Sequence, residues 1–274
     1  MTNPIVVGVD GSSGAQPAIE WAAREAGLRK APLLLLHASQ LFVRDGALTE
    51  VGYERLQRER EHMLRLAHIH AQRSAPAITV DTRMASADPG FALVAASEDA
   101  QIVVTGSRGA GGFERLLLGS VGLYTAAHAR CPAVVVPVLG RSAPLDGPVV
   151  LGIDERHAES EAIGWAFAEA DRRGVPLVAL HGANGFGAPR QEVGEQMELS
   201  AALAGWEPKY PDLEVIHRVV PQSPSQALVE ASAEASLMVI GARRRHGRIG
   251  MALGRVNHAV LHYAGCPVAV IPER

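Results

Sequence analysis

A group of glycines in the first half of the chain has a spacing suited to binding phosphate. A β-branched run ends at Thr105 and leads into a glycine-rich loop, which a Gly-Ser pair follows. Glycine lets the backbone approach a ligand closely, and a helix beginning at Ser120 would add unpaired N–H groups and a positive dipole end. The pattern predicts a phosphate site, the alternative being an ordinary glycine-rich loop. Its residues are Gly106, Ser107, Arg108, Gly109, Gly111, Gly112, Gly119, Ser120 and Val121.

Other residue types that could do chemistry do not form a recognisable site. The chain contains no Gly-Lys-Ser or Gly-Lys-Thr, so the glycine group is not a Walker loop. Cys131 and Cys266 each precede a proline at the start of an apolar run, where we expect small buried residues. His37 and His181 end matching runs, where we expect hydrogen-bonded structural histidines. We assign no metal ligands, catalytic triad or carboxylate pair, and therefore no catalytic residue.

Length and composition favour a two-domain protein with a large core. The 274 residues are 47% hydrophobic and carry a formal charge of −3, more chain than one typical domain needs. Near-neutral charge argues against nucleic-acid binding. No apolar stretch approaches the roughly 18 residues that cross a membrane, and the N-terminus lacks the pattern of a signal peptide. We expect a cytoplasmic protein without membrane or nucleic-acid partners.

An internal repeat divides the chain into two copies. An offset of 144 pairs residues 4–10 with residues 148–154, Trp21 with Trp165, and His37 with His181. Farther on the offset is 135, and it pairs Gly106 with Gly241 and Gly119 with Gly254. A turn-rich segment separates the copies. We predict a first domain over residues 1–138, a linker over 139–147 and a second domain over 148–274.

Within each copy, short apolar runs alternate with segments of helical period. In the first copy the runs predict strands over residues 5–9, 33–37, 78–83, 102–105 and 133–138, mostly buried on both faces. Helices are predicted from Ala15, with Ser12 or Ser13 as cap, from Glu50, from Pro89 and from Ser120. This alternation predicts an α/β fold of two tandem doubly wound domains, each a five-stranded parallel sheet flanked by helices. Ligands are then expected at the carboxyl ends of the strands.

Several segments together resemble the ATP-binding branch of the universal stress protein family. They are residues 7–12, residues 36–38, the glycine group and residues 131–136. With the repeat, the resemblance covers nearly the whole chain, which is similar to tandem two-domain members. It implies a fold like that of adenine nucleotide alpha-hydrolases. It also implies a homodimer and a regulatory protein partner in a stress response, neither of which the sequence identifies further.

The resemblance implies that the first copy holds ATP as its adenine nucleotide. In that family the aspartate after the first strand lies by the ribose and adenine, which corresponds here to Asp10, next to Gly8. The backbone after the second strand borders the adenine, which corresponds to Ala38. The glycine loop and its Gly-Ser pair hold the ribose and phosphates. The sequence leaves open whether Mg²⁺ accompanies the nucleotide.

The second copy departs from the pattern inside the expected site. Arg244 stands where the first copy has Gly109, and Arg255 where it has Ser120. If Gly109 has a left-handed conformation, arginine there costs on the order of 1 kcal/mol. We expect the second copy to bind ATP weakly or not at all, although its arginines can attract another anion. The retained candidate residues are Gly152, Asp154, Gly241, Gly247 and Gly254.

Three classes of function fit these observations. The first is an ATP-binding regulatory protein of the stress response. The second is a slow ATPase or nucleotide-transfer enzyme, which related folds permit. The third is a partner-binding scaffold whose second copy carries no nucleotide. Turnover would favour the second class, and function that survives loss of the first copy's site would favour the third.

Overall fold

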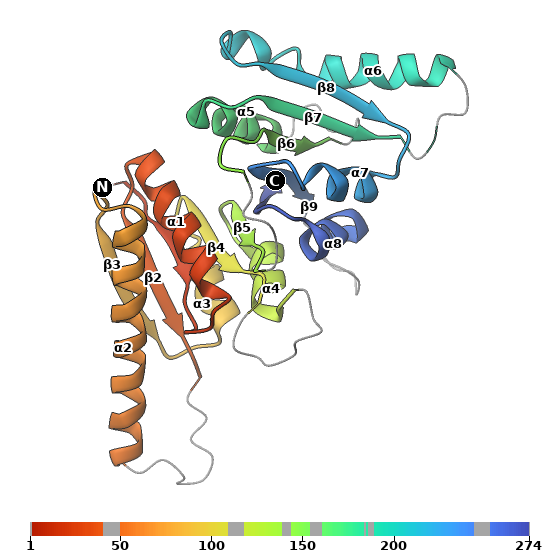
Figure 1. Ribbon diagram of the computed structural model, residues 1–274. Helices are drawn as coiled ribbons and strands as arrows, with labels where there is room; N and C mark the ends of the chain where they lie inside the picture. Colours follow the sequence, from red (N-terminus) through yellow and green to blue (C-terminus); the bar gives the residue numbers. More distant parts are fainter. Residues whose placement is uncertain are drawn as a thin grey trace. The chain divides into compact units, whose positions relative to one another are not determined.

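The computed structural model divides the chain into two compact units, Met1–Val138 and Leu139–Arg274 (Figure 1). It describes residues 2–40, 50–108, 118–138, 144–153, 161–183, 185, 189–243 and 253–273. We call the two units unit 1 and unit 2 and describe each by itself. Among the described residues, no helix is both long and apolar enough to cross a membrane.

Unit 1 contains a sheet of five parallel strands in the order β3-β2-β1-β4-β5. The register is set by apolar runs, with Val6 beside Leu34 on one side and beside Val103 on the other. Every residue from Ile5 to Val7 is fully buried, as expected of a central strand covered on both faces. The strands are β1 (Ile5–Gly8), β2 (Leu33–Ala38), β3 (Val80–Ala85), β4 (Ile102–Gly106) and β5 (Ala133–Val136).

Four helices cover this sheet in two pairs (Figure 1). Helix α1 (Ala15–Arg29) packs on β1 and β4 and contacts α2 (Glu50–Ser74). Helix α3 (Pro89–Ala96) packs on β1 and β2 and contacts α4 (Ser120–His128). The connections through α1 and α2 run along the sheet from β1 toward β3, and those through α3 and α4 run from β3 toward β5. Because such crossovers are right-handed, the two pairs of helices cover opposite faces of the sheet. The predicted doubly wound fold is confirmed.

Unit 2 repeats this arrangement with the strand order β10-β9-β6-β7-β8. Its strands are β6 (Val149–Gly152), β7 (Leu177–Gly182), β8 (Val215–Val220), β9 (Leu237–Arg243) and β10 (Val268–Glu273). Its helices are α5 (Glu161–Arg173), α6 (Pro189–Leu203), the short 3₁₀ helix η2 (Glu207–Lys209), α7 (Pro224–Ala231) and α8 (Gly254–Tyr263). Helix α5 packs on β6, and α7 contacts α8. The residue types of each copy therefore produce the same topology.

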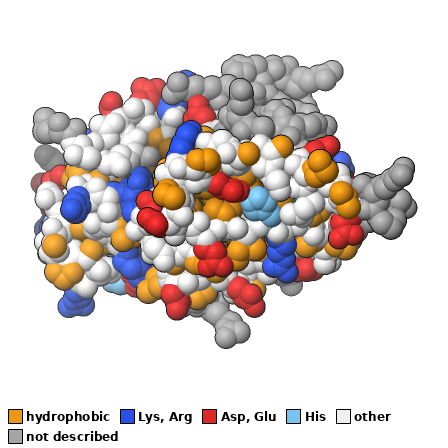
Figure 2. Space-filling view, turned by 90° about the horizontal axis from the view of Figure 1, so that it is seen from above, with side chains coloured by type: hydrophobic (Ala, Val, Ile, Leu, Met, Phe, Trp, Pro, Cys, Tyr) orange, Lys and Arg blue, Asp and Glu red, His pale blue; other side chains and the backbone are white. Residues whose placement is uncertain are grey.

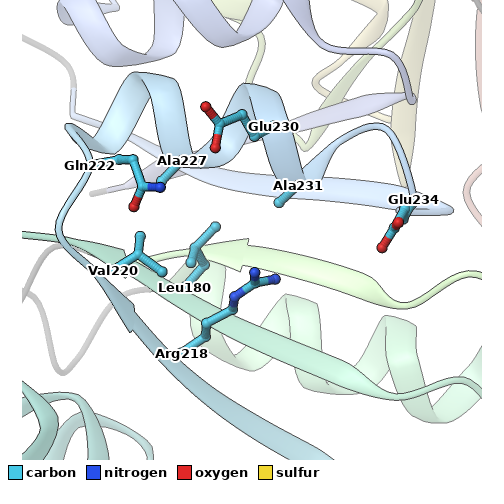
Figure 3. A pocket seen from close by; sticks show the side chains of 8 residues that line it. All are labelled: Leu180, Arg218, Val220, Gln222, Ala227, Glu230, Ala231 and Glu234. Carbon is cyan, nitrogen blue, oxygen red and sulfur yellow. The ribbon is translucent and has the colours of Figure 1, made fainter.

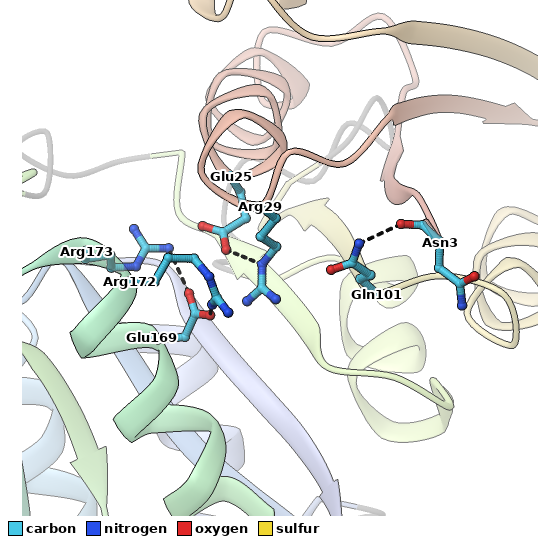
Figure 4. Close-up of polar contacts among 7 residues, drawn as sticks. All are labelled: Asn3, Glu25, Arg29, Gln101, Glu169, Arg172 and Arg173. Carbon is cyan, nitrogen blue, oxygen red and sulfur yellow. Dashed lines mark hydrogen bonds and ion pairs between the residues drawn. The ribbon is translucent and has the colours of Figure 1, made fainter. Parts of the chain in front are cut away.

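The first helix of each unit carries a buried glutamate bonded to arginine (Figure 4). The Nε of Arg29 donates to Oε1 of Glu25 over 2.6 Å, and the Glu25 side chain is 1% exposed. In unit 2 the equivalent Glu169 accepts from Arg172 and, over 3.4 Å, from Arg173. A buried carboxylate is tolerated only when it is paired in this way, because water no longer solvates it.

The predicted helix starts in unit 1 agree with the structure, including Ala15 and Glu50, but the predicted cap of the first helix does not. Helices α3 and α4 begin at the predicted residues Pro89 and Ser120. The prediction that Ser12 or Ser13 caps α1 is wrong, because Gly14 is the N-cap and no side chain caps it. The backbone N–H and hydroxyl of Ser12 instead donate to Oδ1 of Asp10, over 2.9 and 2.6 Å. The hydroxyl of Ser12 is used in this turn and does not cap the first N–H groups of α1.

The strand bounds differ from the sequence pattern where the backbone forms other hydrogen bonds. The third strand begins at Val80 and not at Ile78, whose N–H donates to Ala75 O in a turn. The fifth strand ends at Val136, before a proline without an N–H. The N–H of Val138 donates to Ser107 Oγ instead. β3 is largely exposed, as a strand at the end of the unit 1 sheet order.

Both cysteines are buried free thiols, as their sequence context predicted. Desolvation by burial raises the pKa of the Cys131 thiol from 9.0 to about 12, although backbone hydrogen bonds partly oppose the rise. Burial likewise raises the pKa of Cys266 to about 12. Because the thiolate is the reactive form, both side chains act as small core residues at neutral pH.

The cap of α3 provides a test of the local structure. The side chain of Asp88 accepts from the N–H groups of Gly90 and Phe91 over 2.9 and 3.2 Å. We expect Asp88→Ala to lower the free energy of unfolding by about 1 kcal/mol, because two N–H groups lose their acceptor. The measurement is urea unfolding followed by circular dichroism. The control, Ser13→Ala, should leave the midpoint unchanged, and an equal loss in both variants would contradict the assignment of the cap.

Candidate functional site

The candidate site of unit 1 lies where the strand order of the sheet reverses. Strands β1 and β4 are neighbours, with Val7 beside Val104, but the chain leaves β1 toward β2 and leaves β4 toward β5. The two connections therefore diverge at the carboxyl ends of β1 and β4, which is where doubly wound sheets bind their ligands. The structure brings the predicted residues Gly8, Asp10, Gly106, Ser107 and Arg108 to this edge.

The two loops at this edge approach each other through glycine backbone. A Cβ atom at Gly106 would lie 2.5 Å from the carbonyl oxygen of Gly14, just before α1. A Cβ atom at Gly14 would lie 2.7 Å from the carbonyl oxygen of Arg108. Real Cβ atoms do not approach backbone atoms so closely, and backbone cannot move aside as the end of a side chain can. Glycine at 106 is therefore required by packing within the protein.

Ser107 joins the segments around the loop. Its side chain is 6% exposed, and its Oγ accepts from the N–H of Val138 over 3.1 Å. Its own N–H donates to Val136 O over 2.8 Å, and its carbonyl accepts from the N–H of Gly119 over 2.7 Å. Residues on both sides of the glycine loop are thus held next to the end of β4. The side chain of Ser107 therefore has a structural role, because it binds the backbone of Val138.

The start of α4 presents backbone donors at this edge. Its N-cap, Gly119, has extended φ and ψ of −78° and 157° and supplies no side-chain cap. The first-turn N–H groups of Ser120 and Val121 have no partner within a helix by geometry. Helices α3 and α7, in contrast, are capped by Asp88 and Ser223. An anion at Gly119 would take the place of a cap and meet the positive end of the helix dipole.

Gly119 has room for a Cβ atom, unlike Gly8 and Gly106. The nearest atom to a Cβ placed there is the carbonyl oxygen of Ser107, at 3.7 Å, an ordinary contact distance. Nothing in the described structure therefore requires glycine at 119. The side chain of Val121 packs against a core cluster that includes Val103 and Leu93. Any contact of Val121 with a ligand is accordingly made by its backbone.

The remaining predicted residues form the rim beside β1 and β2. Asp10 is exposed and is held by Ser12, and Ala38 is buried at the end of β2. Between them, His37 Nδ1 lies 2.8 Å from the carbonyl oxygen of Val9, so this histidine fastens the ends of β1 and β2 together. His181 makes the equivalent contact with Ile153 in unit 2, at 3.1 Å. The expectation of structural histidines is confirmed.

The electrostatic character of the surface is mixed. Acidic and basic side chains are interspersed over the described atoms of the face in Figure 2 and do not gather there into one basic area. Arg108, half-buried, adds positive charge at the end of β4. In the described ranges, no three His, Cys, Asp or Glu residues are grouped so that they could hold a metal ion.

The corresponding edge of unit 2 is filled by side chains. The carboxylate of Glu273, at the end of β10, lies against Gly241, with its Cδ 2.9 Å from where a Cβ would be. The side chain of Asn257 donates to the carbonyl oxygen of Gly241 over 2.8 Å. The repeat pairs these residues with Val138 and Gly122 of unit 1. A carboxylate over the glycine disfavours a phosphate there through like charge.

The helix at this edge of unit 2 also starts differently. Gly254, the counterpart of Gly119, has a φ of +74°, and the N-cap is Leu253 in a helical conformation. The donors of α8 are therefore not arranged as those of α4. Gly152 ends β6, where a Cβ would lie 3.0 Å from Leu228. Five predicted site residues lie outside the described residues: Gly109, Gly111, Gly112, Asp154 and Gly247.

The sequence analysis missed Gly14, Glu273 and Asn257. The repeat contains a signal for the last two, because the offset that aligns the glycines also aligns Glu273 with Val138 and Asn257 with Gly122. Gly14 had no such signal. Its role depends on a contact with β4, far away in the sequence.

A serine, a histidine and a glutamate in unit 2 are also hydrogen-bonded in a row. His217 lies 3.0 Å from Ser200 Oγ through Nδ1 and 2.8 Å from Glu207 Oε1 through Nε2. The hydroxyl of Ser200, however, donates to the carbonyl oxygen of Gln196 over 2.9 Å. In a catalytic triad the serine hydroxyl donates to the histidine. Here the hydroxyl of Ser200 donates to a backbone carbonyl instead, so the arrangement is not that of a triad. We assign these contacts to holding α6 and η2 on β8.

A family model now accounts for both units. The model of the universal stress protein family matches residues 1–137 and again residues 147–272. The chain belongs to the universal stress protein family. Because the match occurs twice, it is a tandem universal stress protein.

Similar proteins align with both units of this chain over nearly their whole length. A universal stress protein of Mycobacterium tuberculosis is 35% identical over an alignment of 288 positions, gaps included, which covers 98% of this chain and 96% of that protein. One from Mycolicibacterium smegmatis is 36% identical over 286 residues, with 98% and 97% covered. The crystal structure of a universal stress protein from Archaeoglobus fulgidus superposes with a TM-score of 0.76 at 17% identity and covers 99% of both chains. This last likeness supports the fold alone.

The two glycines of the unit 1 site should respond differently to substitution. We expect Gly106→Ala to lower the free energy of unfolding by about 1–3 kcal/mol, because the added Cβ meets the backbone of Gly14. Gly119→Ala should change it by less than about 0.5 kcal/mol, because the added Cβ makes only an ordinary contact at 3.7 Å. Guanidinium unfolding of both variants measures this difference. Equal stabilities would show that Gly106 does not form the close backbone contact.

Proposed function

We propose that unit 1 binds ATP at the carboxyl edge of β1 and β4 and that occupancy regulates a protein partner in a stress response. The observation that carries the proposal is the uncapped start of α4 at the reversal point of the sheet, next to Gly119, where no backbone or side chain makes a close contact. Backbone donors, a positive dipole end and glycine lie together there, as a phosphate group needs. Membership of the universal stress protein family supports the regulatory role.

The residues of unit 1 fit the parts of the nucleotide by their chemistry. The amides of Ser120 and Val121 suit phosphate oxygens, and the hydroxyl of Ser120 adds a further donor. Arg108, at the end of β4, supplies a charged donor for phosphate. The exposed carboxylate of Asp10 can accept from ribose hydroxyls, and the backbone at Ala38 borders the adenine in this arrangement. Whether Mg²⁺ accompanies the phosphates is decided by the titration described below, which is run with and without the ion.

The proposal extends to a homodimer, as the family resemblance implies, and to a cytoplasmic location. Sedimentation equilibrium at micromolar concentration should give twice the 28.9 kDa mass of the chain. A monomeric mass would contradict this part of the proposal without affecting nucleotide binding.

Calorimetric titration with ATP, with and without Mg²⁺, tests the site. We expect about one ATP per chain, and at least a tenfold loss of affinity, about 1.4 kcal/mol, in Ser120→Arg and in Gly109→Arg. Both substitutions copy residues of the second copy. The matched control, Arg255→Ser in unit 2, should bind as the wild type does. Unchanged affinity in both unit 1 variants would remove the site from this loop, and sustained release of ADP would favour a slow ATPase.

The blocked edge of unit 2 provides a gain-of-function test. We expect a variant with Arg244→Gly, Arg255→Ser, Asn257→Gly and Glu273→Val to bind about two ATP per chain, because it restores the unit 1 residue at each position. A control with only the two arginines replaced should stay at about one, since Glu273 and Asn257 still surround Gly241. Titration of correctly folded protein decides this. If the quadruple variant still binds one ATP per chain, features other than these four residues account for the difference in ATP binding between the units.

A further inference from the structure

Helix α8 of unit 2 carries two histidines one turn apart. His262 follows His258 by four residues, which places both side chains on one face of the helix. Their ring centroids lie 4.5 Å apart, and the ring planes are inclined by 26°. Both residues are partly exposed to solvent. We call them the α8 histidine pair.

The ring nitrogens of the pair are not used within the described part of the chain. Neither His258 nor His262 forms a hydrogen bond or an ion pair with the described residues. His37, His128 and His181, in contrast, each place Nδ1 within hydrogen-bond distance of a backbone carbonyl oxygen. Each ring of the α8 histidine pair therefore has a nitrogen lone pair available to a ligand when it is neutral.

The spacing of the two rings suits one metal ion. A metal–imidazole bond is about 2.0–2.1 Å long, so two nitrogens on one ion lie roughly 3–3.5 Å apart. Rings whose centroids are 4.5 Å apart reach this separation by rotation about the bond between Cβ and Cγ, a soft torsion in histidine. Histidines at positions i and i+4 of a helix supply two ligands of zinc sites in the same way.

Nitrogen ligands select the class of ion. Mg²⁺ and Ca²⁺ are bound through oxygen, whereas imidazole suits Cu²⁺, Ni²⁺ and Zn²⁺. The charge of Arg255, one turn before His258, opposes any cation, but this arginine is exposed and solvent screens it. The pair therefore favours a divalent transition-metal ion.

The equivalent helix of unit 1 lacks the pair. The offset of 135 aligns the α8 histidine pair with Leu123 and Ala127 of α4. Helix α4 instead stacks Tyr124 on His128, with 4.2 Å between ring centroids, and Nδ1 of this histidine lies 2.9 Å from the Tyr124 carbonyl oxygen. A single histidine with one nitrogen already used cannot chelate, so α4 provides a matched comparison within the same chain.

A small groove beside α7 of unit 2 does not offer a second cation site (Figure 3). Its volume is about 210 Å³, and Glu230 and Glu234 are among the residues that line it. Figure 3 shows Arg218 extending from β8 toward α7 in the same groove. A cation there would meet the positive charge of this guanidinium. The α8 histidine pair is not part of the groove lining.

We propose that the α8 histidine pair binds one divalent transition-metal ion, with one nitrogen of His258 and one of His262 as ligands and water in the remaining positions. The site is independent of nucleotide binding in unit 1.

Calorimetric titration of the full chain with Cu²⁺, without nucleotide, tests this site. Cu²⁺ is the probe because nitrogen sites hold it more tightly than the other first-row divalent ions. We expect His258→Gln and His262→Gln each to weaken binding at least about tenfold. Because one ion needs both rings, the double variant should bind no more weakly than either single variant. The matched control, His128→Gln, should leave the affinity unchanged.

Pulsed electron paramagnetic resonance of the bound Cu²⁺ counts its imidazole ligands. We expect two in the wild type and one in either single variant, and thermal melting verifies that each variant is folded. The proposal is overturned if Cu²⁺ binds more weakly than about 100 μM, if either single variant binds as the wild type does, or if His128→Gln weakens binding equally. A further tenfold loss in the double variant also overturns it, because the two histidines would then bind separate ions.

Discussion

The close approach of two backbone segments at Gly14 and Gly106 determines the geometry of unit 1. Without side chains at these positions, the start of α1 lies directly against the end of β4. The turn at Asp10 and the loop after β4 are thereby held on one edge of the sheet, where Ser107 also binds the segment that leads into α4. A single Cβ at Gly106 would meet the carbonyl of Gly14 and push these segments apart. The edge is thus preorganised before any ligand arrives.

The two units show how side chains can leave open or cover the same edge of one fold. Their strand orders are equivalent, so backbone topology alone does not distinguish them. The difference lies in side chains: Glu273 and Asn257 surround Gly241, where unit 1 has Val138 and Gly122. A site made chiefly of backbone donors is sensitive to such changes, because a neighbouring carboxylate or amide competes for the same space. Function therefore depends on the local site and not on the fold.

The sequence predicted the fold because the deciding signals are local. Continuous apolar runs such as residues 102–105 identify buried parallel strands, and Pro89 and Ser120 mark helix starts that the structure confirms. Predictions that depended on competition between local partners were less accurate. Ser12 offered both a cap for α1 and a bond to Asp10, and only the structure showed the second.

The central claim is that the start of α4 receives the phosphates of a nucleotide. Hydrogen exchange of the full chain, measured by mass spectrometry with and without ATP, tests this claim most directly because it reports on backbone amides. The account predicts slower exchange over residues 118–123 when ATP is present, and no change over the equivalent residues 253–258 of unit 2. Equal protection of both segments, or protection confined to other parts of the chain, would contradict it.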